Sequence, residues 1–380
     1  MKPEYKALFE PVKLPNGVQL KNRIVMAPMT HFSSNPDGTL TEAELQYIAR
    51  RSKGVGMVIT ACVYISPNGK GFAGEPSGDR DDMIPDLRRW ASVIQEQGAK
   101  AILQLHHGGR TCQPEEVPNG DVVAPSAISA EREATGGVKP RVPRALEEAE
   151  IEEIIYSFGE ATRRAIKAGF DGIELHGANG YLIQQFFSPH ANRRTDRWGG
   201  SAEKRLTFPM AVVNKVKEIV TAHAEQPFIV GYRFTPEEPE TPGLTMEDAL
   251  LLTDALANKG LDYIHVLVND YRSKPRRGIE DNRTRLEIIK EKAGKRVPVI
   301  GGGSIFTPEE ALETYQTGVE MIALARELII EPDWVEKVQQ GRETEIETTI
   351  KKDAQERLVI PEPLWNVIWS APGWFPGTEK

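Results

Sequence analysis

Eight short apolar segments, rich in valine and isoleucine, alternate along the chain with longer stretches of mixed polarity. Continuous apolar runs of this length are typical of parallel strands that are buried on both faces of a sheet. The pattern therefore predicts eight parallel strands. In chain order they cover residues 23–29, 56–63, 100–107, 170–177, 227–234, 261–268, 297–303 and 321–326.

The stretches between these runs carry amphipathic patterns that begin with helix start signals. A Ser or Thr can cap the first turn of a helix, especially with Glu three positions later, and proline is favoured at the first helical position. The start signals are Thr41 with Glu44, Ser201, Thr245, and Thr307 followed by Pro308. A further helix is predicted over 147–168, ending at Gly169.

The alternation of strands and helices predicts an α/β fold with a single (β/α)8 TIM barrel. An open, doubly wound sheet is the alternative, but closure leaves no strand edge exposed. The pair Asn16-Gly17 predicts a hairpin that closes the bottom of the barrel. Long connections over 108–146 and 178–200 follow strands three and four, on the face where barrels carry their active sites.

Composition narrows the classes of function. The chain has 380 residues, a net charge of −8 and two cysteines. The acidic balance argues against nucleic-acid binding, and two cysteines are too few for a disulfide framework or a four-thiolate iron–sulfur cluster. The N-terminal stretch lacks an apolar signal core, and no apolar run is long enough to cross a bilayer. We therefore expect a cytoplasmic enzyme acting on a small molecule, with no nucleic-acid or membrane partner; a homo-oligomer is left open.

Two segments permit more than one interpretation. The barrel is expected over residues 1–341, and a tail over 342–380 carries three tryptophans. The tail packs on the barrel or on a neighbouring subunit, because aromatic anchors occur in cores and interfaces alike. The basic loop 271–277 is either a solvated loop or a binding site for the phosphate of NADPH or for an acidic substrate.

The end of the fourth predicted strand carries polar side chains. Ile173 and Leu175 share one face of this strand, and Glu174 and His176 share the other. If the two apolar side chains face the helices, His176 points into the barrel. It then lies at the C-terminal rim, where barrel enzymes carry their catalytic residues.

Asn179 and Tyr181 follow on the next loop. His and Asn side chains can together donate hydrogen bonds to a carbonyl, carboxylate or nitro oxygen, and a Tyr with a pKa near ~10 can donate a proton. His176, Asn179 and Tyr181 together suit the reduction of an electron-poor double bond. The alternative is a histidine satisfied within the core beside a surface tyrosine.

Other strand ends add groups that favour a phosphorylated cofactor. Gln104 lies in strand three, and Arg233 lies late in strand five, where an arginine in an apolar strand indicates an anionic partner or ligand. The glycines 301–303 and Arg326 end strands seven and eight, the usual phosphate-binding corner of a barrel. No carboxylate cluster with metal-ligand spacing appears near these ends, so we expect no metal and assign the chemistry to the cofactor.

At these residues the sequence resembles the Old Yellow Enzyme family of FMN-dependent ene-reductases. The resemblance covers residues 7–335 and rests on "LFEPVKLPNGVQLKNRIVMAPMT", "QLHHGGR", "HGANGYLIQQFFSPHANRRTDRWGGSAEKR", the Arg of "VGYRF" and the "GGG…AR" pair. It implies a non-covalently bound FMN, reduced by NADH or NADPH, that reduces activated C=C bonds of α,β-unsaturated carbonyl compounds, or nitro compounds. A flavin-free barrel lyase or aldolase, and an inactive barrel with a binding role, are the alternatives.

The resemblance also implies the roles of individual residues. The implied cofactor-binding residues are Pro28, Met29, Thr30, Ala61, Gln104, Arg233, Gly302, Gly303, Ala325 and Arg326. Flavin N5 is expected to deliver a hydride to the β-carbon of the substrate. His176 and Asn179 are then expected to bind its activating oxygen, and Tyr181 to protonate its α-carbon.

Three departures from the family pattern bear on the candidate site. Thr30 stands where one branch of the family has a cysteine, and Phe32 stands where that branch tends to carry a tyrosine. Ala325 replaces a glycine before the phosphate-binding arginine. Its N–H group can still reach a phosphate if the backbone φ stays negative, which an alanine adopts without strain.

Overall fold

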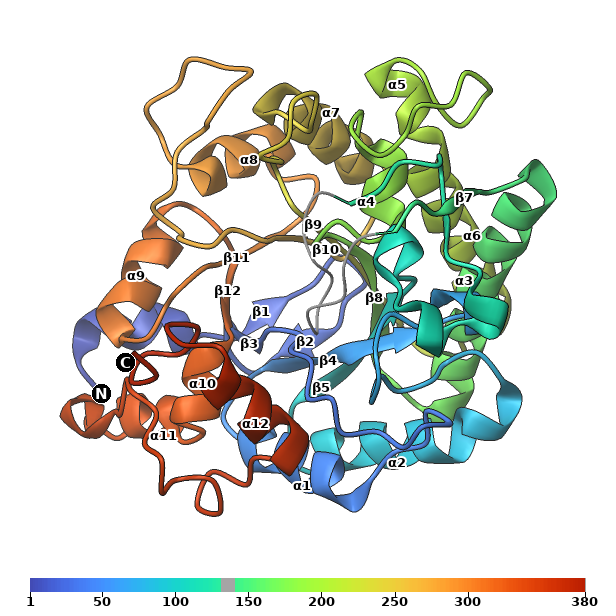
Figure 1. Ribbon diagram of the computed structural model, residues 1–380. Coiled ribbons are helices and arrows are strands. Elements are labelled where there is room, and N and C mark those ends of the chain that lie inside the picture. The colour runs from blue at the N-terminus through green and yellow to red at the C-terminus, as the bar shows by residue number, and fades with distance from the viewer. Residues whose placement is uncertain (131–140, 380) are drawn as a thin grey trace.

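The eight predicted strands close into one barrel in the computed structural model, which describes residues 1–130 and 141–379 (Figure 1). The barrel strands are β3 (Ile24–Met26), β4 (Met57–Tyr64), β5 (Lys100–His106), β8 (Gly172–Gly177), β9 (Ile229–Phe234), β10 (Tyr263–Val266), β11 (Val299–Gly302) and β12 (Met321–Leu324). Neighbouring strands pair in parallel, and the barrel closes where β12 pairs with β3. The predicted TIM barrel is therefore confirmed.

Helices surround the barrel, as Figure 1 shows. They include α1 (Glu42–Ser52), α2 (Ile84–Gln95), α3 (Glu148–Ala168), α6 (Thr207–His223), α7 (Met246–Ala257), α8 (Arg285–Ala293), α9 (Pro308–Gln316) and α10 (Arg326–Ile330). Thr41, Thr245 and Thr307 each form the reciprocal hydrogen bonds of a capping box at the start of their helix. Helix α3 ends at Gly169, whose φ of +88° suits glycine. These helix boundaries were predictable from the start and stop signals.

The helix predicted after Ser201 is divided in two. The Ser201 hydroxyl accepts a hydrogen bond from the N–H of Lys204 and caps α5 (Ala202–Arg205), after which α6 begins as a separate helix. Pro209 has no N–H with which to bond the Arg205 carbonyl, so a continuous helix would lose that hydrogen bond. The proline therefore explains the break.

The predicted hairpin closes the lower end of the barrel. Strands β1 (Val12–Lys13) and β2 (Gln19–Leu20) pair antiparallel on either side of Asn16-Gly17. Val12, Leu14 and Leu20 belong to one buried apolar cluster with side chains from inside the barrel, among them Val25, Met57, Ile59, Ile102, Ile229, Tyr263, Ile300 and Met321. The hairpin therefore seals the end of the barrel opposite the candidate site.

The two long connections contain elements that the sequence patterns did not indicate. After β5, the short strands β6 (Val123–Ala124) and β7 (Arg144–Ala145) pair in parallel as a separate two-stranded sheet. After β8, the buried helix α4 (Leu182–Phe187) begins directly after Tyr181. Because α4 packs against α6 and β8, it fixes the C-terminal end of the short loop that carries Asn179 and Tyr181.

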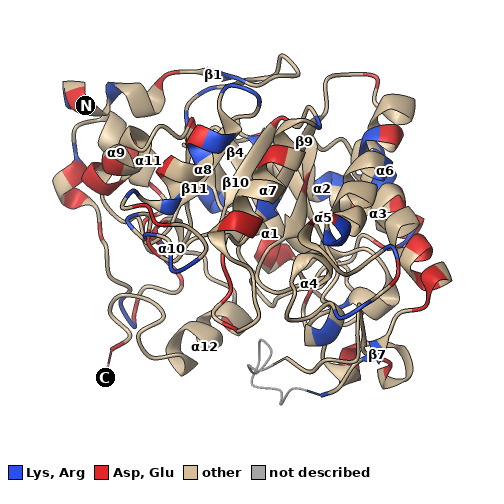
Figure 2. Cartoon of the chain, turned by 90° about the horizontal axis from the view of Figure 1, so that it is seen from above, with Lys and Arg blue, Asp and Glu red and all other residues tan. Residues whose placement is uncertain are grey.

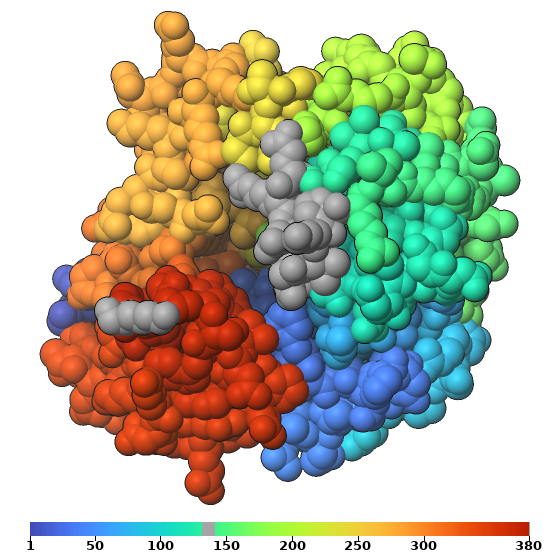
Figure 3. Space-filling view, viewed as in Figure 1, coloured from blue at the N-terminus to red at the C-terminus, as the bar shows by residue number. Residues whose placement is uncertain are grey.

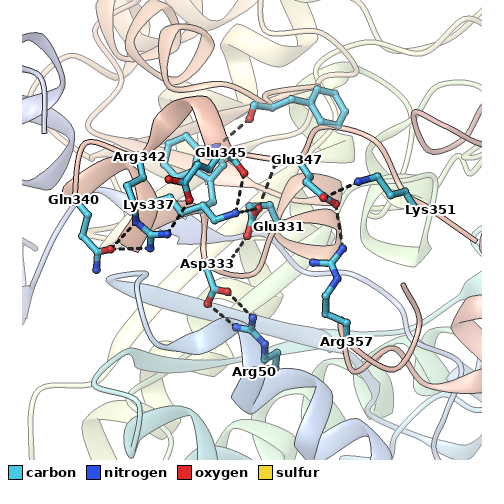
Figure 4. A network of polar contacts seen from close by, with 12 residues as sticks. Arg50, Glu331, Asp333, Lys337, Gln340, Arg342, Glu345, Glu347, Lys351 and Arg357 are labelled. Atoms are coloured by element: carbon cyan, nitrogen blue, oxygen red, sulfur yellow. Dashed lines mark hydrogen bonds and ion pairs between the residues drawn. The ribbon is translucent and has the colours of Figure 1, made fainter. Parts of the chain in front are cut away.

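The C-terminal tail packs on the barrel of its own chain. Helix α11 (Trp334–Gln339) precedes it, and α12 (Glu362–Ser370) places Leu364 and Ile368 in the same buried cluster as the outer faces of the strands. Ion pairs hold this region, including Arg50 with Asp333, the residue before α11, and Arg357 with Glu347 within the tail (Figure 4). The structure thus places the tail on its own barrel, while the proposed division at residues 341/342 stays a prediction.

Charged side chains lie mainly on the outer helices and loops, with both signs interspersed (Figure 2). Among the helices of residues 1–130 and 141–379, none is long and apolar enough to cross a membrane.

Candidate active site

The barrel interior is layered. Apolar side chains fill the lower part, above the hairpin, and polar side chains occupy the next inward positions of four strands. These are Gln104 on β5, Glu174 and His176 on β8, Arg233 on β9 and His265 on β10, all at least nine-tenths buried. Ile173 and Leu175 belong to the cluster that faces the helices, so the predicted inward orientation of His176 is correct.

Glu174 links this polar layer together. Its Oε1 accepts a hydrogen bond from Gln104 Nε2 at 2.7 Å, and its Oε2 lies 3.0 Å from Nδ1 of His265. Its charge also raises the pKa of Arg233 against the stronger lowering effect of burial. Strand alternation predicted that Glu174 lies on the inner face of the strand, but it indicated no role for this residue. The structure makes it the carboxylate that balances the buried arginine.

Arg233 is the cationic group at the floor of the site. Its side chain is buried, and its Nε has no hydrogen-bond partner among the described residues. Burial lowers its pKa, but an arginine remains protonated. An unpaired buried guanidinium N–H is costly unless a ligand accepts its hydrogen bond, so this atom marks a ligand position.

A cavity of about 360 Å³ opens above Arg233. Its wall includes the predicted phosphate-binding residues, and Figure 3 shows this face of the molecule hollowed between the red C-terminal tail and the orange segment around β11. The lining residues of interest are Ala27, Arg233, His265, Gly302, Gly303, Ser304, Ala325, Arg326 and Trp374. The structure thus brings Arg233, Gly302, Gly303, Ala325 and Arg326 to one cavity.

Two of the glycines that line this cavity are required by the neighbouring backbone. A Cβ on Gly302 would lie 2.8 Å from the carbonyl oxygen of Ala323, and Gly303 has a φ of +124°, which other residues rarely adopt. Ala325 has a φ of −115°. This value is negative, as expected, so the N–H of the alanine can reach a phosphate without backbone strain. Arg326 Nη2 donates a hydrogen bond of 2.8 Å to Ser304 Oγ, which orients the guanidinium at the cavity wall.

A second cavity of about 690 Å³ adjoins the first through Leu267, Val268 and Asn269, which line both. Asn179 and Tyr181 line this second cavity. The backbone of Asn179 has a φ of 59° and donates from its N–H to Thr235 Oγ1 at 3.0 Å. Asn tolerates this left-handed conformation better than most residues. The loop therefore presents Asn179 at the cavity mouth.

His176 lies beside Tyr181, with ring centroids 4.9 Å apart and the rings nearly perpendicular. Burial, together with His106, Arg233 and His265 nearby, holds the pKa of His176 well below its ordinary value, so its ring is neutral. Its Nδ1 accepts a hydrogen bond from the N–H of Ala178 at 3.3 Å, which places the proton on Nε2. His176 is therefore a neutral hydrogen-bond donor.

The remaining predicted residues lie around the rim. Pro28, Met29 and Thr30 directly follow Ala27, the residue of this segment that lines the smaller cavity. Ala61 lies in β4 where the strand register shifts between Ile59 and Cys62. For Pro28, Met29 and Thr30 the structure gives proximity to the site and no contact that defines a role, and for Ala61 it gives only its place in β4 and in the large buried cluster.

The basic loop 271–277 forms part of the wall of the larger cavity. The N–H groups of Arg276 and Arg277 donate to the buried carboxylate of Glu237, which also pairs with Arg285. Arg277 donates further to backbone carbonyls, including that of Glu238. These contacts stabilise the conformation of the loop itself, so Arg277 in particular is engaged within the protein.

The donor set fits a phosphorylated aromatic cofactor. The smaller cavity offers a glycine-lined corner with Arg326 for a phosphate and the unpaired Arg233 Nε for an electron-rich ring edge. Gln104 donates one of its two side-chain N–H groups to Glu174. Its carbonyl oxygen and its second N–H are therefore available to a ring that has both donors and acceptors. FMN has this chemistry.

Comparisons with known proteins agree with this geometry. Residues 7–345 match the model of the NADH:flavin oxidoreductase / NADH oxidase family. The chain is 52% identical to the probable NADH-dependent flavin oxidoreductase YqiG of Bacillus subtilis, over 99% of both chains. Morphinone reductase in complex with tetrahydroNAD superposes with a TM-score of 0.76 at 30% identity, over 88% of this chain and 91% of that one. The Old Yellow Enzyme homologue of Zymomonas mobilis has a TM-score of 0.79 at 25% identity, over 95% and 99%.

The cofactor and reductant inferred from the sequence are therefore confirmed, and the flavin-free lyase and the inactive barrel are set aside. This chain belongs to the NADH:flavin oxidoreductase / NADH oxidase family, within the Old Yellow Enzyme group, and is an FMN-dependent oxidoreductase that uses a nicotinamide as its reductant.

Proposed function

We propose that the protein reduces C=C bonds activated by a neighbouring carbonyl group, with NADH or NADPH as the electron source. The observation that carries this proposal is the placement of Asn179 and Tyr181 at one wall of a cavity that joins the cofactor cavity, with the neutral His176 packed against Tyr181. A substrate there meets two hydrogen-bond donors and a phenol. Reduction of a conjugated alkene needs both kinds of group.

The cofactor is held by side chains and backbone from several strand ends. We assign Gly302, Gly303, Ala325 and Arg326 to its phosphate, and Arg233 and Gln104 to the polar edge of its ring. Pro28, Met29, Thr30 and Ala61 are assigned to packing against that ring. When bound, FMN supplies the redox chemistry, taking a hydride from the nicotinamide and giving one to the substrate.

The chain's own residues prepare the substrate. His176 Nε2–H and the Asn179 amide donate hydrogen bonds to the activating oxygen, which withdraws electrons from the double bond and makes its β-carbon electrophilic. Because His176 is neutral, it polarises this oxygen without transferring a full charge or a proton. Tyr181 donates its phenolic proton to the α-carbon, which completes the saturation of the bond.

Nitro compounds are a second substrate class in the same site. A nitro oxygen can take the place of the carbonyl oxygen at His176 and Asn179. Reduction at nitrogen does not require a proton on carbon, so this reaction depends on Tyr181 less than alkene reduction does.

The first test is anaerobic and spectroscopic. The purified protein is expected to show an oxidised-flavin absorption band that bleaches when NADH or NADPH is added. Addition of 2-cyclohexenone should then restore the band and yield cyclohexanone. A band that bleaches but is restored only by oxygen or ferricyanide, across a panel of enones and nitroaromatics, would contradict the proposed substrate class.

Replacement of Arg326 by Ala is expected to weaken FMN binding by about 10- to 100-fold. A hydrogen bond to a charged group is worth about 1.5–3 kcal/mol, and tenfold corresponds to about 1.4 kcal/mol. The measurement is a fluorescence titration of the apoprotein with FMN and with riboflavin, which lacks the phosphate. Riboflavin affinity should change little. The exposed Arg283, paired with Asp281, provides a matched Arg→Ala control. Equal losses for FMN and riboflavin would refute the phosphate contact.

A further inference from the structure

A second group of buried polar side chains lies behind Tyr181 and has no part in the proposed reaction. Cys62 on β4, Glu75 in the segment between β4 and α2, and His106 at the end of β5 have ligand-type atoms within 4.8 Å of one another. Glu75 and His106 are fully buried. Such a trio can hold a metal ion or form a hydrogen-bonded pair, and the partners of Glu75 distinguish the two.

Both carboxylate oxygens of Glu75 already accept hydrogen bonds. Oε1 lies 2.6 Å from His106 Nδ1, and Oε2 accepts the N–H of Gly71, also at 2.6 Å. The thiol of Cys62 points to Oε1 at 3.8 Å. An ionised carboxylate is an acceptor only, so the proton between Glu75 and neutral His106 belongs to Nδ1 of the imidazole.

This assignment leaves a lone pair on Nε2 of His106. Nε2 is buried and has no hydrogen-bond partner among the described residues. The His106 ring packs edge-on against Tyr181, with centroids 4.3 Å apart, and lies 5.5 Å from the ring of His176. A carboxylate that holds one ring nitrogen of a histidine packed beside a reacting group is the arrangement by which proteins stabilise a transient imidazolium.

We propose that Glu75 and His106 form a proton relay that restores the proton of Tyr181 after each turnover. The relay rests on the proposed function, because it needs Tyr181 as the donor. The Tyr181 O–H bond breaks when its proton forms the new C–H bond of the product. A solvent proton then adds to the Nε2 lone pair of His106, and the tyrosinate takes this proton from Nε2, directly or through one water, which returns His106 to its neutral form. Glu75 remains ionised throughout, and each turnover consumes one solvent proton.

The groups around His106 favour a relay over a metal site. Burial raises the pKa of the Cys62 thiol well above its ordinary value, so the soft ligand of the trio stays protonated. Metal binding would also have to break the 2.6 Å contact between Glu75 and His106. The other titratable neighbours, His107 and His176, are neutral because burial lowers the pKa of each. Glu75 is therefore the charge that faces a protonated His106.

The relay has a kinetic signature that a structural role lacks. In a His106→Gln variant, Tyr181 still starts each experiment protonated. The first reduction of 2-cyclohexenone by pre-reduced, FMN-loaded enzyme should therefore proceed near the wild-type rate. Later turnovers must wait for the tyrosine to regain its proton, so the steady-state rate should fall about tenfold or more, and further as the pH rises from 7 to 9.

Ferricyanide provides an acceptor that takes electrons but no proton on carbon. Its steady-state reduction should be unchanged in His106→Gln. Glu75→Gln keeps the size of the side chain and tests the relay independently if the first variant does not fold; it is expected to show the same split between first and later turnovers. Cys62→Ala is the matched control, because it removes the third group of the trio and leaves the pair intact, and its pH profile should match the wild type.

Three outcomes would overturn the relay. One is a wild-type steady-state rate and pH profile in both His106→Gln and Glu75→Gln. Another is a first turnover, or a ferricyanide rate, that falls as much as the steady state, which would indicate a structural role. The third is stoichiometric metal in the purified protein that is lost in Cys62→Ala. Failure of the proposed function differs from all three, because Tyr181→Phe would then reduce the enone at the wild-type rate.

Discussion

Replacement of Tyr181 by Phe is expected to lower enone reduction by about 100-fold or more and to leave flavin reduction by NADH unchanged. The phenylalanine ring can keep the packing against His106 and His176, so the substitution removes the proton donor and little else. Hydride transfer from the nicotinamide needs no proton from this side chain. The loss should therefore appear in one half-reaction only.

Anaerobic stopped-flow measurement of both half-reactions checks this expectation. Oxidised enzyme is mixed with NADH in one experiment, and pre-reduced enzyme is mixed with 2-cyclohexenone in the other. Tyr156→Phe is the matched control, because Tyr156 is exposed on α3. Equal loss in both half-reactions would indicate disturbed cofactor binding, and an unchanged enone rate would remove Tyr181 from the mechanism. Nitro reduction should be affected less than enone reduction.

The barrel could be predicted from the sequence because its determinants are local. Each buried strand is a continuous apolar run, and each capping box joins residues three positions apart, as Thr41 and Glu44 do. Where a single residue interferes with the local pattern, the prediction fails by a few residues, as at Pro209. The short strands β6 and β7 carry no such pattern, since two residues are too few to show an alternation.

The candidate site could be predicted only in part, for the same reason. His176, Asn179 and Tyr181 lie within one short stretch, and strand alternation orients the first of them. Glu75 is separated from His106 by 31 positions and lies in a loop, so no periodicity connects the two. Glu174 had a predicted orientation but no predicted partners. Those partners come from neighbouring strands, and their register is fixed only when the barrel closes.

The tail illustrates a different limit. Its tryptophans and apolar positions indicate that it covers an apolar surface, but the pattern does not say which surface. The structure places it on its own barrel and brings the Trp374 carbonyl to the guanidinium of Arg326. A segment 48 positions away along the chain therefore contributes to the phosphate corner of the cofactor cavity.

Replacement of Glu327 by Gln is expected to stabilise the folded protein by about 3 kcal/mol at pH 7 and about 5 kcal/mol at pH 8, and by less than about 1 kcal/mol near pH 5. Glu327 follows Arg326 in α10 and is fully buried, and neither carboxylate oxygen has a hydrogen-bond partner among the described residues. Burial, with Glu331 and Glu310 nearby, raises its pKa from 4.5 to about 10. The folded state therefore keeps Glu327 protonated at neutral pH.

The sign of the pH dependence follows from this shift. Between pH 4.5 and about 10 the folded state binds a proton on Glu327 that the unfolded chain has released. Unfolding then becomes easier as the pH rises, by about 1.4 kcal/mol per pH unit from this group. Gln mimics the protonated carboxyl but does not titrate, so the variant lacks this loss of stability. At pH 5 the folded forms of both proteins carry a neutral side chain, and the difference in their stabilities should fall below about 1 kcal/mol.

Urea denaturation at pH 5, 6.5 and 8, with FMN saturating throughout, measures the effect. The difference in unfolding free energy between Glu327→Gln and the wild type should grow with each step in pH. Glu356→Gln removes an equal charge from an exposed position of the tail and should show no such trend. A constant difference at all three values would mean that Glu327 is ionised in the folded protein. Its charge would then need a partner close to the phosphate corner, and the Arg326 guanidinium beside it in α10 would be the first candidate.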